Sequence, residues 1–177
     1  MRFHRKTVVS LALALLTLAA ARAHAQSEGV AGRWLLDEAA STSMKQIVDA
    51  GMSKLGRVYR VWPISTQAKK RLQDTNRRYT WILITRQPGD SVEVRTDTYT
   101  LTTPSNGVRK DWEREKGDFI DVTTRWEGNR LEQTFDASDG RRVNVYTVAP
   151  DGTLHLDVTV TSPKLDSPLT YRMVYHR

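Results

Sequence analysis

The side chains of this sequence that could do chemistry are few, and their spacing does not form a recognisable catalytic set. Asp111, Glu113 and Glu115 alternate along one predicted strand face with Arg109 in phase, and paired carboxylates can perform acid–base catalysis. A run this polar is more typical of a solvated face, and the chain has no Gly-x-Ser-x-Gly nucleophile motif. We therefore expect no catalytic residues, and an enzyme is a disfavoured interpretation.

Metal-ligating side chains are also scarce. His155 and His176 each lie on the polar face of a predicted strand, and Asp136, Asp139 and Gly140 lack the ligand series of a calcium loop. The chain contains no cysteine, which excludes disulfides and thiolate metal sites. We expect no metal site and no cofactor.

The N-terminal segment has the layout of a secretory signal peptide. Three basic residues precede an apolar run over residues 8–21, and a small-x-small motif follows at residues 23–25. A retained membrane anchor is the alternative, but the run is shorter than the roughly 20 apolar residues of a spanning helix. The sequence predicts a signal peptide over residues 1–25, one mature domain over residues 26–177, and a periplasmic or secreted location.

The charge of the chain is unevenly distributed. The formal charge of +7 falls to +3 without residues 1–25, because these contain four basic and no acidic residues. Residues 44–78 contain nine basic and two acidic residues, so the rest of the mature domain is mildly acidic. This pattern does not favour a nucleic-acid partner. It indicates one basic segment on an acidic body.

Alternating residues predict a mostly β domain. Residues 154–161 place apolar side chains on one face of a strand and polar side chains on the other. Similar segments cover residues 80–86, 92–97, 119–126, 131–136, 143–148 and 169–175. Short glycine-containing turns such as Asp151-Gly152 join neighbouring antiparallel strands. We expect an antiparallel up-and-down β-barrel of about 8–10 strands.

Helical periodicity interrupts this pattern after the first predicted strand, residues 32–37. Ser43 and Gln46 have the spacing of a capping box, and apolar residues recur on one helical face after them. A second, more polar helix is expected over about residues 65–76. The sequence therefore predicts a two-helix insert over about residues 43–77.

Several short motifs accompany this order of elements. The first strand contains Gly32-Arg33-Trp34, and the last ends with Val174-Tyr175. The motifs between them are Gly56-Arg57, the segment 126–131, Asp139-Gly140 and Asp151-Gly152-Thr153-Leu154. In this order the chain resembles the fatty-acid-binding proteins, a family of the calycin (lipocalin) superfamily. The resemblance covers the chain from Gly32 to the C-terminus. It implies a barrel with an internal cavity beneath the two helices.

The resemblance also suggests where a ligand would bind. In that family a carboxylate is commonly held by two arginines and a tyrosine on the last strands. Tyr175 matches the tyrosine, but Met173 occupies one arginine position and the other falls near Tyr146 or Thr147. A buried carboxylate without a cationic partner is costly, so we expect a neutral ligand. The residues expected to line the cavity are Gln133, Thr147, Tyr171, Met173 and Tyr175.

The basic segment coincides with the predicted helical insert. Lys54, Arg57, Lys69, Lys70 and Arg71 belong to it, and the resemblance implies that this portal region can meet membranes. A cation near an anionic membrane surface gains about 1 kcal/mol. One hypothesis is that these helices dock on an anionic membrane surface, and the alternative is a solvated helix face.

The favoured function is a periplasmic or secreted binding module for a small apolar or amphipathic molecule. The principal alternative is a structural or interaction protein of the cell envelope whose barrel is filled by side chains. An outer-membrane barrel is less favoured, because it needs long loops at one end and the turns here are short. The presence of a cavity separates the first two.

Overall fold

A computed structural model describes residues 29–115 and 117–177, and its strands form a single antiparallel sheet. The predicted signal peptide, residues 1–25, lies outside the described residues. The sheet has ten strands in the order β4-β3-β2-β1-β10-β9-β8-β7-β6-β5. The strands are β1 (Gly32–Asp37), β2 (Trp81–Gln87), β3 (Ser91–Thr96), β4 (Thr100–Pro104), β5 (Lys110–Glu115), β6 (Asp118–Glu127), β7 (Arg130–Ala137), β8 (Gly140–Val148), β9 (Leu154–Thr161) and β10 (Leu169–His176).

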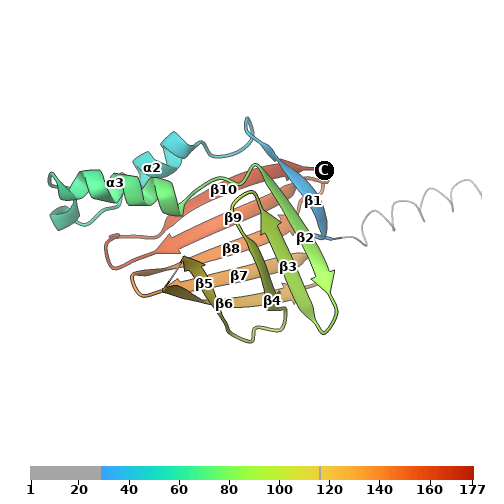
Figure 1. Ribbon diagram of the computed structural model, residues 1–177. Helices are drawn as coiled ribbons and strands as arrows, with labels where there is room; N and C mark the ends of the chain where they lie inside the picture. Colours follow the sequence, from blue (N-terminus) through green and yellow to red (C-terminus); the bar gives the residue numbers. More distant parts are fainter. Residues whose placement is uncertain (1–28, 116) are drawn as a thin grey trace, which may run out of the picture.

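Pairing between the first and last strands brings the ends of the meander together (Figure 1). Leu36 of β1 lies opposite Tyr175 of β10, while Trp34 lies opposite Ile82 of β2 on the other side. Every other pair of neighbours in the sheet is consecutive in the chain. The predicted up-and-down barrel with a helical insert after the first strand is therefore confirmed.

The barrel is nearly closed between its two edge strands, β4 and β5. The segment that follows β4 hydrogen-bonds to β6, through Gly107 N to Thr124 O at 2.8 Å and Trp126 N to Ser105 O at 2.9 Å. The buried hydroxyl of Thr103 on β4 also donates to Thr124 Oγ1 at 2.7 Å. These bonds satisfy polar groups that an open sheet edge would leave unpaired.

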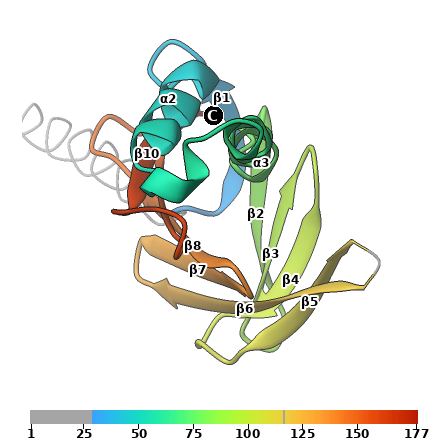
Figure 2. The same ribbon diagram turned by 90° about the vertical axis from the view of Figure 1, so that its left-hand side faces the viewer.

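Helices α2 (Met44–Ser53) and α3 (Ile64–Thr75) form the insert, with the 3₁₀ turn η1 (Arg57–Tyr59) between them. The predicted capping box is confirmed: Gln46 N donates to Ser43 Oγ at 3.3 Å and Ser43 N donates to Gln46 Oε1 at 2.8 Å. The helices pack closely at Gly51, where an added Cβ would lie 2.8 Å from the Leu72 methyl groups. Figure 2 shows them together over one end of the barrel. Among the described residues, no helix is long and apolar enough to cross a membrane.

Hydrogen bonds tether α2 to the barrel at both ends. Before the helix, the buried Ser41 hydroxyl donates to Val174 O at 3.2 Å and accepts from Val174 N at 2.8 Å. After it, Gly56 N donates to Lys164 O at 3.0 Å in the loop between β9 and β10. The position of the insert is therefore fixed by the last strand and the loop before it.

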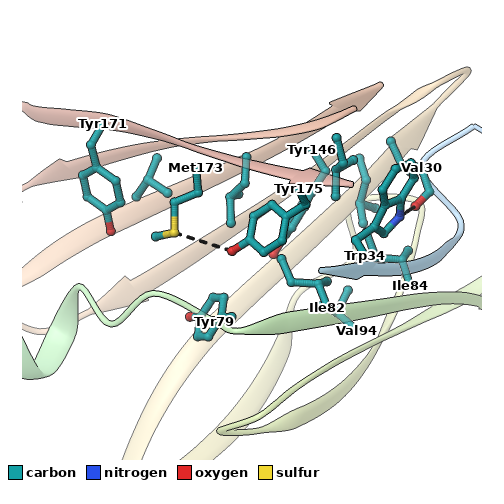
Figure 3. Packing of buried hydrophobic residues seen from close by; sticks show 14 of the residues in the cluster. Val30, Trp34, Tyr79, Ile82, Ile84, Val94, Tyr146, Tyr171, Met173 and Tyr175 are labelled. Carbon is teal, nitrogen blue, oxygen red and sulfur yellow. Dashed lines mark hydrogen bonds between the residues drawn. The ribbon is translucent and has the colours of Figure 1, made fainter. Parts of the chain in front are cut away.

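Large side chains fill the end of the barrel away from the helices. Trp34 is completely buried, and its Nε1 donates to Val30 O at 2.9 Å. Tyr146, Met173 and Tyr175 are also fully buried in the same cluster (Figure 3). This base is a packed core of the kind that dominates domain stability.

We predict that Gly140→Ala destabilises the protein by about 1–3 kcal/mol. An added Cβ would lie 2.6 Å from the backbone oxygen of Thr161, which cannot move without disturbing the pairing of β8 and β9. Gly56→Ala is the matched control, because its closest neighbour is the exposed Asp166 carboxylate at 3.3 Å. Urea unfolding of both variants measures the difference, and equal midpoints would contradict the tight contact at Gly140.

Candidate functional site

A cavity of about 530 Å³ lies between helix α3 and the neighbouring end of the barrel. This volume is within the usual range of small-molecule sites, about 300–1,000 Å³. Ala68 and Leu72 of α3 form one wall, and Phe135 of β7 and Val160 of β9 belong to the opposite one. Helix α3 therefore covers a partly open space that the barrel side chains do not fill.

Aromatic rings form a continuous apolar surface in this cavity. Tyr79 and Tyr99 meet edge to face with ring centroids 5.5 Å apart, and Tyr99 lies 5.2 Å from Trp112. Trp112 in turn lies 6.1 Å from Phe135. All four rings line the cavity. Such a surface suits the apolar body of a ligand.

Arg142 of β8 brings a cation to the inner side of the barrel. It is two residues from Asn144 and four from Tyr146, which are both buried, so all three share the inward face of the strand. Its Nε donates to Asn144 Oδ1 at 2.8 Å, and its Nη1 donates to Thr75 O at 2.8 Å. Thr75 is the last residue of α3, where a positive charge stabilises the helix dipole. Arg142 therefore connects the barrel to the end of its helical cover.

The rim of the cavity is strongly basic. Six cationic residues line it against two carboxylates. The cations are Arg71, Arg77, Arg114, Arg141, Arg142 and Lys164, and the carboxylates are Asp74 and Asp139. An excess of this kind raises the local concentration of anions.

The buried tyrosines remain protonated at neutral pH. Burial raises the pKa of Tyr99 well above its usual value, with further increases from Tyr79 and Tyr146 and an offset from Arg142. Burial also raises the pKa of Tyr146 and of Tyr171. Their hydroxyl groups can therefore serve as hydrogen-bond donors, and the Tyr99 hydroxyl is shielded from water without a partner among the described residues.

Four of the five predicted lining residues point into the barrel, but in the strand rows below those that line the cavity. Gln133, Tyr171, Met173 and Tyr175 are buried and lie outside the lining of the cavity. Figure 3 shows Tyr171, Met173 and Tyr175 along β10, with Tyr175 Oη donating to Met173 Sδ at 3.5 Å. A role for these four residues in binding stays a prediction.

The hydroxyl groups of the buried Tyr171 and Tyr146 are used internally. Tyr171 Oη donates to the buried Asn76 Oδ1 at 3.0 Å, just after α3. Tyr146 Oη donates to Gln133 Oε1 at 3.4 Å. These bonds join secondary-structure elements, as in a core without ligand.

Thr147 was expected to face inward, and the structure places it on the outer face of β8. Buried Tyr146 is its neighbour and pairs with buried Leu156, so alternation directs Thr147 outward. It lies opposite His155 of β9 and Arg130 of β7, which are not buried. The expectation that Thr147 faces inward was therefore wrong. A shift of one residue along a strand moves a side chain to the opposite face of the sheet.

The five predicted portal cations differ in their surroundings. Lys54 donates to Pro168 O, Lys70 pairs with Asp74 at 2.6 Å, and Arg71 pairs with Asp139 at 3.0 Å. Arg57 and Lys69 are exposed, and no ion pair forms at either within the described part of the chain. Only Arg71 of the five lines the cavity.

The acidic strand considered for catalysis lies on the surface. Arg109 pairs with Asp111 at 3.4 Å and with Asp121 at 2.9 Å, and all three side chains are substantially exposed. In residues 29–115 and 117–177, no group of three or more His, Asp or Glu side chains is placed to hold a metal ion.

Arg142, Tyr79 and Tyr99 are the site residues that sequence reasoning missed. The signal for Arg142 was present, since alternation from the inward Tyr146 places residue 142 on the same face. Tyr79 and Tyr99 gave no such signal, because each lies just outside a strand and its position depends on the approach of α3.

No family model and no curated protein matches this chain. Solved structures with a similar fold include a Schistosoma mansoni fatty acid binding protein in complex with arachidonic acid, with 22% identity and a TM-score of 0.51 over 86% of this chain and 98% of that chain. Secretory abundant heat soluble protein 4 from Ramazzottius varieornatus has 15% identity and a TM-score of 0.51, covering 85% and 95%. The REP1-NXSQ fatty acid transporter has 20% identity and a TM-score of 0.50, covering 83% and 94%. This chain therefore has the barrel fold of the fatty-acid-binding proteins.

Proposed function

We propose that this protein is a periplasmic or secreted carrier that binds a small amphipathic molecule beneath helix α3. The observation that carries the proposal is the cavity of about 530 Å³, which combines a surface of four aromatic rings with a basic rim. An apolar body would contact the rings, and a polar group would face the rim.

The cavity supports the binding module over the filled-barrel interaction protein. The base of the barrel is filled, as an interaction protein without ligand would require, since Trp34, Tyr146 and Tyr175 are fully buried there. The opposite end is not filled, because α3 crosses it at a distance from the barrel wall. The cavity of about 530 Å³ lies at this end, so we place the binding site there.

The printed names of the structural neighbours are consistent with carriage of an amphipathic molecule. One neighbour is in complex with arachidonic acid, and another is called a fatty acid transporter. The predicted signal peptide over residues 1–25 would direct the carrier out of the cytoplasm. Native mass spectrometry of protein purified from the periplasm, with extraction of any bound molecule, would identify the natural ligand.

We predict that Ala68→Trp weakens binding of 1-anilinonaphthalene-8-sulfonate, an aromatic anion that becomes fluorescent in apolar sites. The indole would occupy the cavity from its helical wall and lower the affinity about tenfold or more. Gln67→Trp is the matched control, because Gln67 is the preceding helix residue and is exposed outside the cavity. Fluorescence titration measures both variants. If Ala68→Trp binds the dye like the native protein, the ligand does not occupy this cavity.

We further propose that the carrier exchanges its ligand at an anionic membrane through the link between its helices. The side chains of Val58, Val61 and Trp62 there are 68%, 56% and 82% exposed. Arg57 and Lys69, which flank this segment in the chain, form no ion pair among the residues described. Figure 1 shows this link at the outer tip of the insert. Exposed tryptophan beside cations is the composition of an interfacial anchor.

We predict that Arg57→Gln with Lys69→Gln weakens sedimentation with phosphatidylglycerol vesicles, by about fivefold for each charge. Trp62→Ser should weaken binding to anionic and neutral vesicles alike, because it removes apolar area rather than charge. Arg95→Gln with Arg130→Gln, on the exposed barrel wall, controls for net charge. Binding that does not depend on the vesicle charge would refute electrostatic docking.

A further inference from the structure

We propose that the natural ligand has two apolar branches, and that the side chains of Arg77 and Thr98 separate the two spaces that receive them. One space is the cavity beneath α3, and the other is a second pocket beside it, which we call the annex. A two-chain lipid such as a diacylglycerol has this shape. The inference rests on the proposed carrier function and adds the shape class of its ligand.

The annex has a volume of about 310 Å³ and adjoins the cavity. Four segments form it: the end of β1, the start of α2, the connection from α3 to β2, and the turn between β3 and β4. Arg77 of the connection and Thr98 of the turn also line the cavity of about 530 Å³. The two spaces are therefore neighbours with a shared wall.

The shared wall can be moved at little cost. The Arg77 side chain is 63% exposed, and within the described residues its carboxylate contact is with Asp74 at 4.0 Å. An exposed pair of this length contributes little to stability. Thr98 is exposed and has a short side chain. A small rotation of the arginine would therefore connect the cavity with the annex.

The floor of the annex is apolar. Leu36 and Met44 line it, and both are partly buried and pack against the hydrophobic core of the barrel. An apolar ligand group would cover these two side chains and remove their remaining surface from water. The annex therefore suits an aliphatic branch of a ligand.

The polar side chains around this floor are paired within the protein. Arg78, whose side chain is only 18% exposed, donates to the exposed carboxylate of Glu38 at 2.8 Å. The Thr80 hydroxyl donates to Asp97 at 2.7 Å. Because these groups already have partners, the annex offers a ligand mainly its apolar floor.

Two apolar spaces with a polar wall between them fit a branched amphiphile. One chain would contact the aromatic rings of the cavity, and the second would cover Leu36 and Met44. The branch point would lie beside the Arg77 guanidinium and the Thr98 hydroxyl, which can hydrogen-bond ester and hydroxyl oxygens. A single-chain molecule would occupy one space and leave the other to water.

The test compares dioctanoylglycerol with monooctanoylglycerol, two uncharged probes that differ by one chain. Isothermal titration below their aggregation concentrations should show that the native protein binds one dioctanoylglycerol about tenfold or more tightly than monooctanoylglycerol. Met44→Trp, which places an indole in the annex, should reduce this ratio about tenfold and leave binding of monooctanoylglycerol unchanged. Met52→Trp is the matched control, because Met52 lies on the same helix outside both linings.

The ratio of the two affinities separates filling of the annex from a general loss of structure. If Met44→Trp weakens both probes equally, the ratio persists, which overturns the inference. Arg77→Ala provides a second test at an exposed position if Met44→Trp does not fold. It removes the wall between the spaces, so the ratio should rise about threefold. An unchanged ratio in Arg77→Ala would also overturn the inference.

Three further outcomes decide between the proposals. Equal affinity of the native protein for both probes overturns the two-branched ligand but leaves the carrier function intact. Failure of both probes and of the anilinonaphthalene dye to bind overturns the carrier function itself. Binding of two monooctanoylglycerol molecules, with one of them lost in Met44→Trp, would make the annex an independent site and overturn the single branched ligand.

Discussion

The pairing of β1 with β10 is the constraint on which the rest of this structure depends. It closes the ten-stranded sheet except at the β4–β5 edge, so that alternate side chains of every strand face one interior. The same two strands hold the helical insert, because Ser41 follows β1 and bonds both backbone atoms of Val174. The strand pairing that closes the barrel therefore also positions its helical cover.

The barrel interior is filled by side chains at its base, the end away from the helices, and less completely filled at its mouth, the end beneath α3. This difference follows from the elements that surround each end. At the base, Trp34, Leu156 and Tyr175 are enclosed by strands on all sides and fill the space completely. At the mouth, the facing element is a helix that contributes only Ala68 and Leu72 as apolar side chains to the wall. The small side chain of Ala68 and the polar face of α3 leave a volume that the barrel residues do not reach.

Local patterns predicted most of the fold but little of the site. Strict alternation located residues 154–161, and Ser43 with Gln46 located the start of α2. Strand β4 was missed because its threonines lie on both faces and hide the contrast between inside and outside. The site could not be located in the same way, since it depends on the distance between α3 and the barrel. The prediction of the lining instead followed the resemblance, which directed it to buried residues below the cavity and, at Thr147, to the outer face.

The depth at which a cation is buried determines the free energy that its desolvation costs. An arginine at position 173 would replace a fully buried methionine that accepts a hydrogen bond from Tyr175, in a base where few groups could solvate a charge. At position 142 the guanidinium has a helix C-terminal carbonyl, an amide oxygen and an aromatic ring beside it. These neighbours stabilise a positive charge without neutralising it. The charge can therefore persist near the mouth of this barrel, beneath α3, and not at its base.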